Sequence, residues 1–187
     1  TNSNGGTLFI PRGRYIITDT ITIDSNISFE GEGSDGSDGD VGMASRKAIS
    51  EFKWGVIDTG KPMFSIVGNI GGITWNKFCI NGYYDATHYA DGVLIDRLVN
   101  STISNITIYR CSNGITLKPV TTVLHDNSMI NVFSRIEFYQ CINGLLLDAT
   151  DDYATANCCH NTFINIDVSF SGVYGIYLKG YDNNTFI

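Results

Sequence analysis

A four-residue motif that returns within a short distance is the feature that most constrains how this sequence can fold. Asn-Thr-Phe-Ile begins at Asn161 and again at Asn184, 23 residues later. The alternating apolar runs between the two copies are bounded by Gly and Asn and are too short for helices, so they favour β-strands. A module that returns at this spacing predicts a solenoid, in which successive coils of chain stack on one another.

The same module can be followed backward through the chain. Each copy opens with a glycine, at Gly92, Gly114, Gly144 and Gly175, and continues with alternating apolar residues. Alternate residues of a strand point to the same side, so one set of side chains is expected to face the core. The pattern predicts an all-β chain without long helices. The expected inward set consists of Val93, Ile95, Ile115, Leu117, Leu145, Leu147, Ile176 and Leu178.

Some coils are longer than others, and the extra residues mark loops. Two neighbouring coils carry them at the same corner, at about Pro119–Ser128 and Ala149–Cys158, and an earlier coil is lengthened at Asn81–Asp91. A further inserted loop covers residues 33–50. Loops displayed on the corners of a rigid core are the usual carriers of function in such folds.

Length and charge limit the domain organisation and the partners. At 187 residues the chain is predicted to form one domain, 1–187, large enough for a continuous core. The formal charge of −7 argues against nucleic acid or an anionic membrane as a partner. No apolar run approaches the roughly 18 residues that span a bilayer, so no membrane insertion is expected. Both ends fall inside the strand pattern, so the chain is interpreted as a piece of a longer polypeptide, incomplete at both ends.

The order of the first strands resembles a known superfamily. Residues 5–15, Gly-Gly-Thr-Leu-Phe-Ile-Pro-Arg-Gly-Arg-Tyr, precede residues 27–33, Ile-Ser-Phe-Glu-Gly-Glu-Gly. This order resembles the first coils of the pectate-lyase-like superfamily, which includes pectate lyases, polygalacturonases and many phage tailspikes. The resemblance implies a single-stranded right-handed parallel β-helix.

The catalytic motifs of that superfamily are not reproduced. Polygalacturonases carry Asn-Thr-Asp before the strand glycine, and Ala90-Asp91-Gly92 matches only part of it. Their paired aspartates have a counterpart only in Asp151-Asp152, displaced into a loop, and Gly-His-Gly and Arg-Ile-Lys are absent. The resemblance therefore implies the fold and leaves the activity open.

One candidate site is a column of charges on the outer surface. The fourth residue after each module glycine points outward, which gives Asp96, Lys118, Asp148 and Lys179. Stacked coils place them about 4.8 Å apart, so opposite charges on neighbouring rungs attract one another. As an alternative, Asp96 and Asp148 lie two rungs apart, near the roughly 6.5–9.5 Å separation of inverting glycosidases. A lyase would instead use Lys118 as the base and the two aspartates to bind calcium or a uronate.

A second candidate is the outward column Thr107, Glu137 and Asp167. Glu137 and Asp167 are predicted to lie on adjacent rungs, about 5 Å apart, as the carboxylates of retaining glycosidases do. Two carboxyl groups at so short a distance are not easily ionised together. One protonated and one ionised carboxyl group would suit the roles of acid and nucleophile. The candidate catalytic residues are therefore Asp148, Asp96, Glu137 and Asp167.

Aromatic and acidic residues near these columns are candidates for sugar binding. Tyrosines can stack on the apolar faces of sugar rings while their hydroxyls hydrogen-bond. The glycan-facing surface is expected where the charged column meets the three loops. The candidate binding residues are Lys118, Asp91, Tyr83, Tyr84, Tyr89, Asp151, Asp152 and Tyr177.

The motifs predict no cofactor and no metal site, with calcium as an open alternative. The acidic loop that carries Asp35, Asp38 and Asp40 could gather around calcium, or it could be a solvated loop. Cys111 and Cys141 occupy equivalent positions of neighbouring coils, which favours stacked thiols over a disulfide.

Three functions are compatible with these features. The first is a phage tailspike or a related β-helix, located on the virion surface or outside the cell. It would bind a host polysaccharide, either with or without cleaving it. The second is a free secreted enzyme, either a glycoside hydrolase or a polysaccharide lyase. The third is a structural β-helix stalk without a ligand. The resemblance to tailspikes implies a homotrimer, for which the outward Leu94, Leu146 and Tyr177 offer an apolar stripe.

Overall fold

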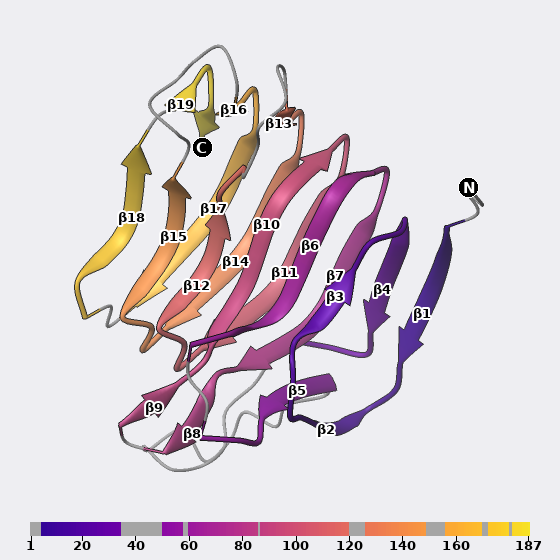
Figure 1. Cartoon of the computed structure of the whole chain (residues 1–187), viewed down its shortest axis with the longest axis vertical. Helices are drawn as coiled ribbons and strands as arrows, with labels where there is room; N and C mark the ends of the chain where they lie inside the picture. Colours follow the sequence, from indigo (N-terminus) through magenta and orange to yellow (C-terminus); the bar gives the residue numbers. More distant parts are fainter. Residues whose placement is uncertain are drawn as a thin grey trace.

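A computed structural model of the chain shows an all-β protein, as the sequence predicts (Figure 1). Within the described ranges the chain forms strands and no helix, so that part of the chain contains no membrane-spanning helix. The described residues form two nine-stranded sheets and one two-stranded sheet. The described residues are 5–34, 50–57, 60–85, 87–119, 126–148, 156–169, 172–179 and 181–187.

The first sheet is built from strands that lie about one repeat apart in the sequence. Along its length it contains β1 (Gly6–Ile10), β4 (Ile27–Gly31), β7 (Thr74–Asn81), β11 (Thr102–Tyr109), β14 (Val132–Tyr139), β17 (Thr162–Ser169) and β20 (Thr185–Phe186). Two further strands, β2 (Gly13–Ile17) and β5 (Ser50–Trp54), pair with each other, and β5 also pairs with β7. Every pairing in this sheet is parallel.

The second sheet contains the intervening strands, so the chain passes repeatedly from one sheet to the other, with one or two consecutive strands in each. Its order is β18 (Tyr174–Lys179), β15 (Asn143–Asp148), β12 (Asn113–Leu117), β10 (Asp91–Val99), β13 (Asp126–Met129), β16 (Ala156–Cys159) and β19 (Tyr181–Asp182), with β6 (Pro62–Gly71) and β3 (Ile21–Ile23) attached through β10. These pairings are also parallel. Antiparallel pairing occurs in the hairpin of β8 (Tyr83–Asp85) and β9 (His88–Tyr89).

Equivalent residues of successive repeats lie directly beside one another. Ile106 pairs with Ile136, which pairs with Ile166 in the next strand. The same holds in the second sheet, where Val93 pairs with Ile115. The module alignment read from the sequence is therefore the strand register of the structure. Parallel strands in register are compatible with the expected β-helix.

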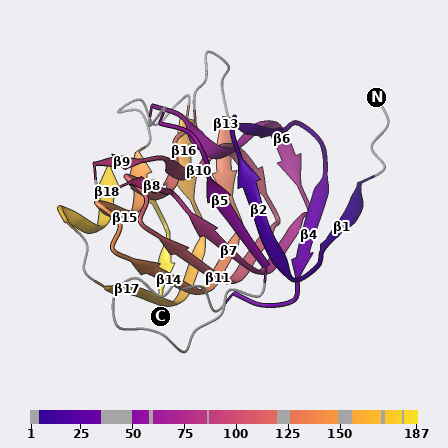
Figure 2. The same ribbon diagram turned by 90° about the horizontal axis from the view of Figure 1, so that it is seen from below.

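The apolar side chains of both sheets meet in one core. Figure 2 shows the strands of the two sheets from below. The predicted inward residues Val93, Ile95, Ile115, Leu117, Leu145 and Leu147 are all buried. The expectation is wrong for Ile176, which is 40% exposed, because β18 is the last strand at its end of the described sheet. Leu178 is partly buried and packs against the core.

Two predicted loops are shorter than the sequence suggested. The carboxyl-terminal parts of Pro119–Ser128 and Ala149–Cys158 belong to strands β13 and β16, which pair in register. These stretches are polar, so their sequences do not predict strands. They form strands because they pair with the equivalent segment of the neighbouring repeat. The remaining residues, 120–125 and 149–155, lie outside the described residues.

A column of buried polar side chains runs along one corner of the structure. Asn131 Oδ1 accepts a hydrogen bond from the Ser101 amide at 3.0 Å, and Asn161 Oδ1 accepts one from the Asn131 amide at 3.1 Å. The side-chain amide of Asn131 also donates to Leu98 O at 2.6 Å and to Asn161 Oδ1 at 2.9 Å. Asn184 continues the column by accepting from the Asn161 amide. These bonds satisfy buried backbone groups that have no partner within a strand.

The two stacked cysteines are free thiols, as predicted. Cys111 and Cys141 are both buried, and neither forms a disulfide. Their thiols donate to main-chain carbonyls, Cys111 to Tyr109 O at 3.6 Å and Cys141 to Ile108 O at 3.5 Å. Burial raises the pKa of Cys111, so its thiol stays protonated at neutral pH.

We predict that Asn131→Leu lowers the free energy of unfolding by about 3 kcal/mol or more, because it leaves several buried backbone groups without partners. Urea denaturation followed by circular dichroism measures the effect. The matched control is Asn69→Leu, at an exposed position of β6, which should change the stability by less than about 0.5 kcal/mol. Equal stability of the two variants would mean that the polar column does not support the fold.

A second corner column adopts left-handed backbone conformations, and one of its members is unsuited to them. Asn100, Ile130, His160 and Asn183 have φ values of 49°, 58°, 53° and 48°. A β-branched side chain in this region clashes with its own backbone, whereas Asn tolerates it. Ile130 is also 53% exposed, so little burial offsets the strain.

Ile130→Asn is therefore expected to raise the free energy of unfolding by about 1 kcal/mol through relief of backbone strain. Differential scanning calorimetry would show the change as a higher Tm. The reciprocal substitution Asn100→Ile, at the equivalent position of the preceding repeat, should lower the Tm. A fall in Tm for Ile130→Asn would show that the isoleucine makes contacts worth more than the strain.

Candidate functional site

An open groove of about 390 Å³ lies on the outer face of the first sheet, across β11, β14 and β17. The groove contains two carboxylates, a guanidinium and two side-chain amides, which together can donate and accept hydrogen bonds. Its lining residues are Ser34, Asn105, Thr107, Arg135, Ile136, Glu137, Asn165 and Asp167. All three residues of the second predicted column, Thr107, Glu137 and Asp167, therefore line one groove.

A row of left-handed residues forms one side of this groove. Asn105, Arg135 and Asn165 have φ values of 51°, 52° and 52°, at equivalent positions of three neighbouring strands. The side-chain amide of Asn105 donates to Asn76 Oδ1 at 2.8 Å, which fixes its orientation. Arg135 is exposed and supplies the positive charge of the groove.

The carboxylates of Glu137 and Asp167 stand on adjacent strands in register. Parallel strands lie about 4.8 Å apart, so the separation predicted from the sequence agrees with this register. Glu137 Oε2 accepts a hydrogen bond from the Thr107 hydroxyl at 3.4 Å, and Asp167 Oδ1 accepts one from the Ser169 hydroxyl at 3.2 Å. Glu137 is half-buried and Asp167 is exposed, so the two acids have different environments.

The charged column of the second sheet also forms, but its charges pair with one another. Asp148 lies beside Lys179 in register, and Lys118 donates its backbone amide to Ile95 O, next to Asp96. Lys118 Nζ is 3.1 Å from Asp148 Oδ2, and Lys179 Nζ is 3.9 Å from Asp148 Oδ1. Both ammonium groups therefore contact the Asp148 carboxylate, and its charge is paired within the column.

Asp91 belongs to a polar ladder along the amino ends of the second sheet. Its Oδ1 accepts from the amide of Asn113 at 3.1 Å and from the side-chain nitrogen of Asn113 at 2.8 Å. Asn143 in turn donates its side-chain nitrogen to Asn113 Oδ1 at 2.8 Å. Burial raises the pKa of Asp91, and the hydrogen bonds from Asn113 offset part of that effect. The geometry gives this carboxylate a structural role at the start of the ladder.

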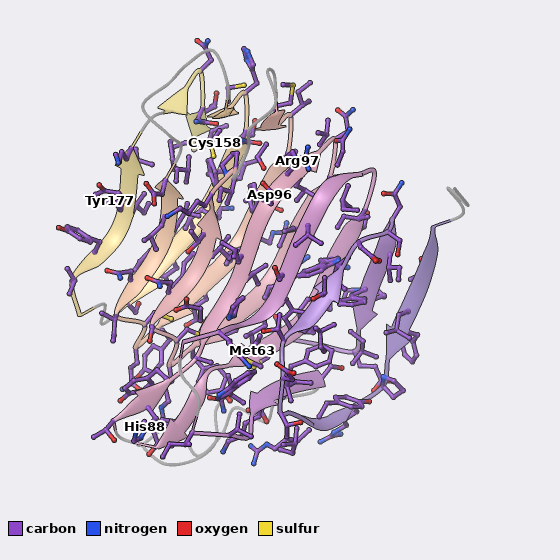
Figure 3. The ribbon with its side chains drawn as sticks, in the orientation of Figure 1. Met63, His88, Asp96, Arg97, Cys158 and Tyr177 are labelled. Atoms are coloured by element: carbon purple, nitrogen blue, oxygen red, sulfur yellow. The ribbon has the colours of Figure 1, made fainter. Side chains whose placement is uncertain are left out.

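Two tyrosines of the predicted sugar site, Tyr83 and Tyr89, do not lie beside the charged column. Tyr83 and Tyr89 form the hairpin before β10, with ring centroids 6.0 Å apart. Asp96 lies five residues further along β10 than Asp91, about 16 Å in an extended strand. Figure 3 shows this separation, with His88 of the hairpin far from Asp96. The expected single surface is therefore divided into two regions.

The other predicted residues are distributed as follows. Tyr177 lies on β18, with its ring centroid 5.3 Å from that of Tyr174. The backbone of Tyr84 forms part of β8, and its side chain is outside the described part of the structure. Asp151 and Asp152 lie outside the described residues, as do Asp35, Asp38 and Asp40 of the candidate calcium loop. Within the described ranges, no group of three or more His, Cys, Asp or Glu side chains is arranged to hold a metal.

A buried carboxylate that sequence reasoning missed lies in the same outward column as Glu137. Glu51 is only 1% exposed, and its carboxylate accepts hydrogen bonds from the side chains of Arg14, Asn81 and Tyr109. The alternation Glu51-Phe52-Lys53-Trp54 predicts that Glu51 points away from the core, but no sequence signal reports that it is covered. With three donors it is well satisfied, and it ties β2, β5, β7 and β11 together.

Next to this cluster, two cations flank one of the predicted tyrosines. The guanidinium carbon of Arg110 lies 4.7 Å from the centroid of the Tyr83 ring, and Lys53 Nζ lies 5.9 Å from it. Both distances fall within the range of a cation–π interaction. The ring therefore helps to fix the hairpin against the first sheet, which limits its freedom to stack on a sugar.

Comparison with known proteins gave no match: no family model, no curated protein and no solved structure is similar to this chain. The case for a function therefore depends on the geometry of the chain's own residues.

We predict that Asp91→Asn raises the Tm at pH 7 and has little effect near pH 4. A carboxyl whose folded pKa lies above its unfolded value of 3.8 stabilises the fold at low pH, and this contribution is lost as the pH rises through the folded pKa. The amide avoids the cost of a half-buried charge and can still accept from Asn113. Thermal melts between pH 4 and pH 8 measure the difference. The exposed Asp24→Asn is the control, and an equal gain from it would contradict the role of burial.

Proposed function

We propose that the chain is a right-handed parallel β-helix of the phage tailspike type that binds a host polysaccharide in the groove over β11, β14 and β17. The observation that carries this proposal is the pairing of Glu137 and Asp167 in register within that groove. The virion-surface setting is part of the proposal and rests on the resemblance of the first strands to that superfamily.

The strand arrangement supports the fold part of the proposal. Strands of successive repeats pair in parallel and in register in both sheets, as coils of a β-helix would. Columns of left-handed residues recur at the same corners, which keeps the bends of neighbouring repeats aligned. The buried column of Ser101, Asn131 and Asn161 repeats the same hydrogen bond from one repeat to the next.

The chemistry of the groove supports the ligand part. Sugars present many hydroxyls, each of which donates and accepts hydrogen bonds, and the groove offers carboxylates, amides and a guanidinium within one surface. Arg135 and Asn165 border the carboxylates of Glu137 and Asp167 on the same side. Because equivalent positions repeat along the sheet, a linear glycan would meet a similar set of groups at each rung.

If the bound glycan is cleaved, the same two carboxylates are the candidates for the acid and the nucleophile. They are register partners on adjacent strands, which lie about 4.8 Å apart, close to the roughly 5–5.5 Å between the carboxyl groups of retaining enzymes. One carboxyl group would donate its proton to the glycosidic oxygen while the other attacks the anomeric carbon and forms a glycosyl ester. Water, deprotonated by the first residue, would then hydrolyse that ester. Glu137 is half-buried whereas Asp167 is exposed, so Glu137 is assigned the acid–base role.

The charged column of the second sheet remains the second candidate for catalysis. A lyase built on it would need Lys118 as a base, and Lys118 pairs with Asp148. An inverting hydrolase would need Asp148 or Asp96 as an acid, and the Asp148 carboxylate is already engaged in ion pairs with Lys118 and Lys179. The groove is therefore the preferred site, and Asp148 supplies a comparison for it.

The test uses the intact protein, polysaccharide from candidate hosts and four variants, of which Asp148→Asn is the control. Arg135→Ala should weaken glycan binding about 10-fold or more. Glu137→Gln and Asp167→Asn should lower turnover at least about 100-fold while binding changes little. Asp148→Asn, in the other sheet, should retain both activities. Binding is measured by isothermal titration calorimetry, turnover by release of reducing ends, and folding by the Tm.

Each outcome has a distinct meaning. Loss of turnover in Asp148→Asn alone would move the catalytic site to the charged column. Binding without turnover in the wild-type protein would leave a glycan-binding β-helix. A wild-type protein that neither binds nor cleaves host glycans would favour the structural stalk. Release of new unsaturated sugar ends, rather than reducing ends alone, would indicate a lyase.

A further inference from the structure

The outer face of the second sheet carries two parallel columns of side chains. One is mostly apolar and contains Leu94, Thr116, Leu146 and Tyr177, which pair in register across β10, β12, β15 and β18. The other is the charged column Asp96, Lys118, Asp148 and Lys179, one position from the buried Ile95, Leu117 and Leu147 and the partly buried Leu178. Figure 1 shows these four strands side by side at the front, and Figure 3 marks Asp96 and Tyr177 on the outer two.

The charges of this face have a specific order along the column: negative, positive, negative, positive. Reading the column from the other end gives the opposite sign at every rung. A second copy of the column placed against the first in the same direction brings like charges together. A second copy placed in the reversed direction brings Asp96 to Lys179 and Lys118 to Asp148, so that opposite charges meet at all four rungs.

Symmetry decides which arrangement is available to a homo-oligomer. A rotation axis parallel to the column keeps every rung at its own height, as in the expected trimer, and each charge then meets its own kind. A two-fold axis parallel to the strands, midway between β12 and β15, reverses the column of the second copy. Such an interface is isologous, because each copy contributes the same surface.

The apolar column fits the same reversed arrangement. About the same axis, Leu94 lies opposite Tyr177 of the second copy, and Thr116 lies opposite Leu146. All four side chains are half-buried in the single chain, so pairing would remove further apolar surface from water. Four to six strands at about 4.8 Å spacing, with about five residues each, offer roughly 300–500 Å² per copy. This is less than the roughly 800 Å² per partner of standard interfaces, so only a weak, transient association is expected.

We propose that this face binds a second copy of the chain in the reversed direction, which forms a weak two-fold dimer. The groove over β11, β14 and β17 belongs to the other sheet and is not part of the interface. The proposal therefore does not depend on the proposed glycan-binding function. The competing arrangement is the trimer implied by resemblance to tailspikes. In such a same-height trimer, equivalent strands of the three copies lie at the same height along the rotation axis.

Sedimentation velocity of the wild-type protein should show a monomer–dimer equilibrium in the micromolar range that weakens with added salt. Lys118→Glu places like charges at two symmetry-related contacts and should raise the dimer dissociation constant at least about 10-fold. Lys118→Glu combined with Asp148→Lys restores opposite charges across the two-fold axis and should recover dimerisation. Lys61→Glu, which makes the same change in net charge outside this face, should have little effect.

Cross-linking distinguishes the two arrangements without changing charge. In the reversed dimer, a mixture of the Leu94→Cys and Tyr177→Cys proteins should be joined by a short bis-maleimide, while Leu94→Cys alone should not, because its two copies are three rungs apart. The same-height trimer predicts the opposite result. The five native cysteines are buried, so the wild-type protein is the control. A monomer at every concentration, a trimer, or cross-linking of Leu94→Cys to itself would overturn the proposal.

Discussion

Register between successive repeats is the constraint on which the rest of the structure depends. Parallel strands hold it through backbone hydrogen bonds, and Asn131 and Asn161 hold it a second time through side-chain bonds at a buried corner. A shift of one residue would turn the inward face outward and break the buried column at once. Exposure of apolar side chains and loss of buried hydrogen bonds both oppose the same shift. The register of each repeat relative to the next is therefore fixed.

A fixed register converts positions in the repeat into columns in space. Residues about 30 apart in the sequence become neighbours, which is why Glu137 lies beside Asp167 and Lys118 beside Asp148. The chemistry of a column then depends on the order of its residues. Opposite charges in alternation give a column that neutralises itself, and two acids in succession beside Arg135 give a surface that can engage a ligand.

Much of the fold could be predicted from the sequence because it depends on spacing alone. The module alignment gave the strand partners, the inward Leu117 and Leu147, and the adjacency of Glu137 and Asp167. The burial of individual side chains could not be predicted, because it depends on which other parts of the structure cover each position. Glu51 is buried on an outward-facing column, and Ile176 is exposed on an inward-facing one. The strand character of Asp126–Met129 likewise comes from its neighbour in the sheet rather than from its own polar sequence.

The connection between β15 and β16 differs greatly in length from the one between β18 and β19, although both join the same two columns. Leu147 pairs with Leu178, and Cys158 pairs with Tyr181. The connection from Leu147 to Cys158 therefore advances 11 positions, whereas the equivalent connection from Leu178 to Tyr181 advances 3. The register on either side is unaffected by this difference. Insertions and deletions at this corner can therefore accumulate during evolution without disturbing the core, which makes it a tolerant place to graft a new peptide.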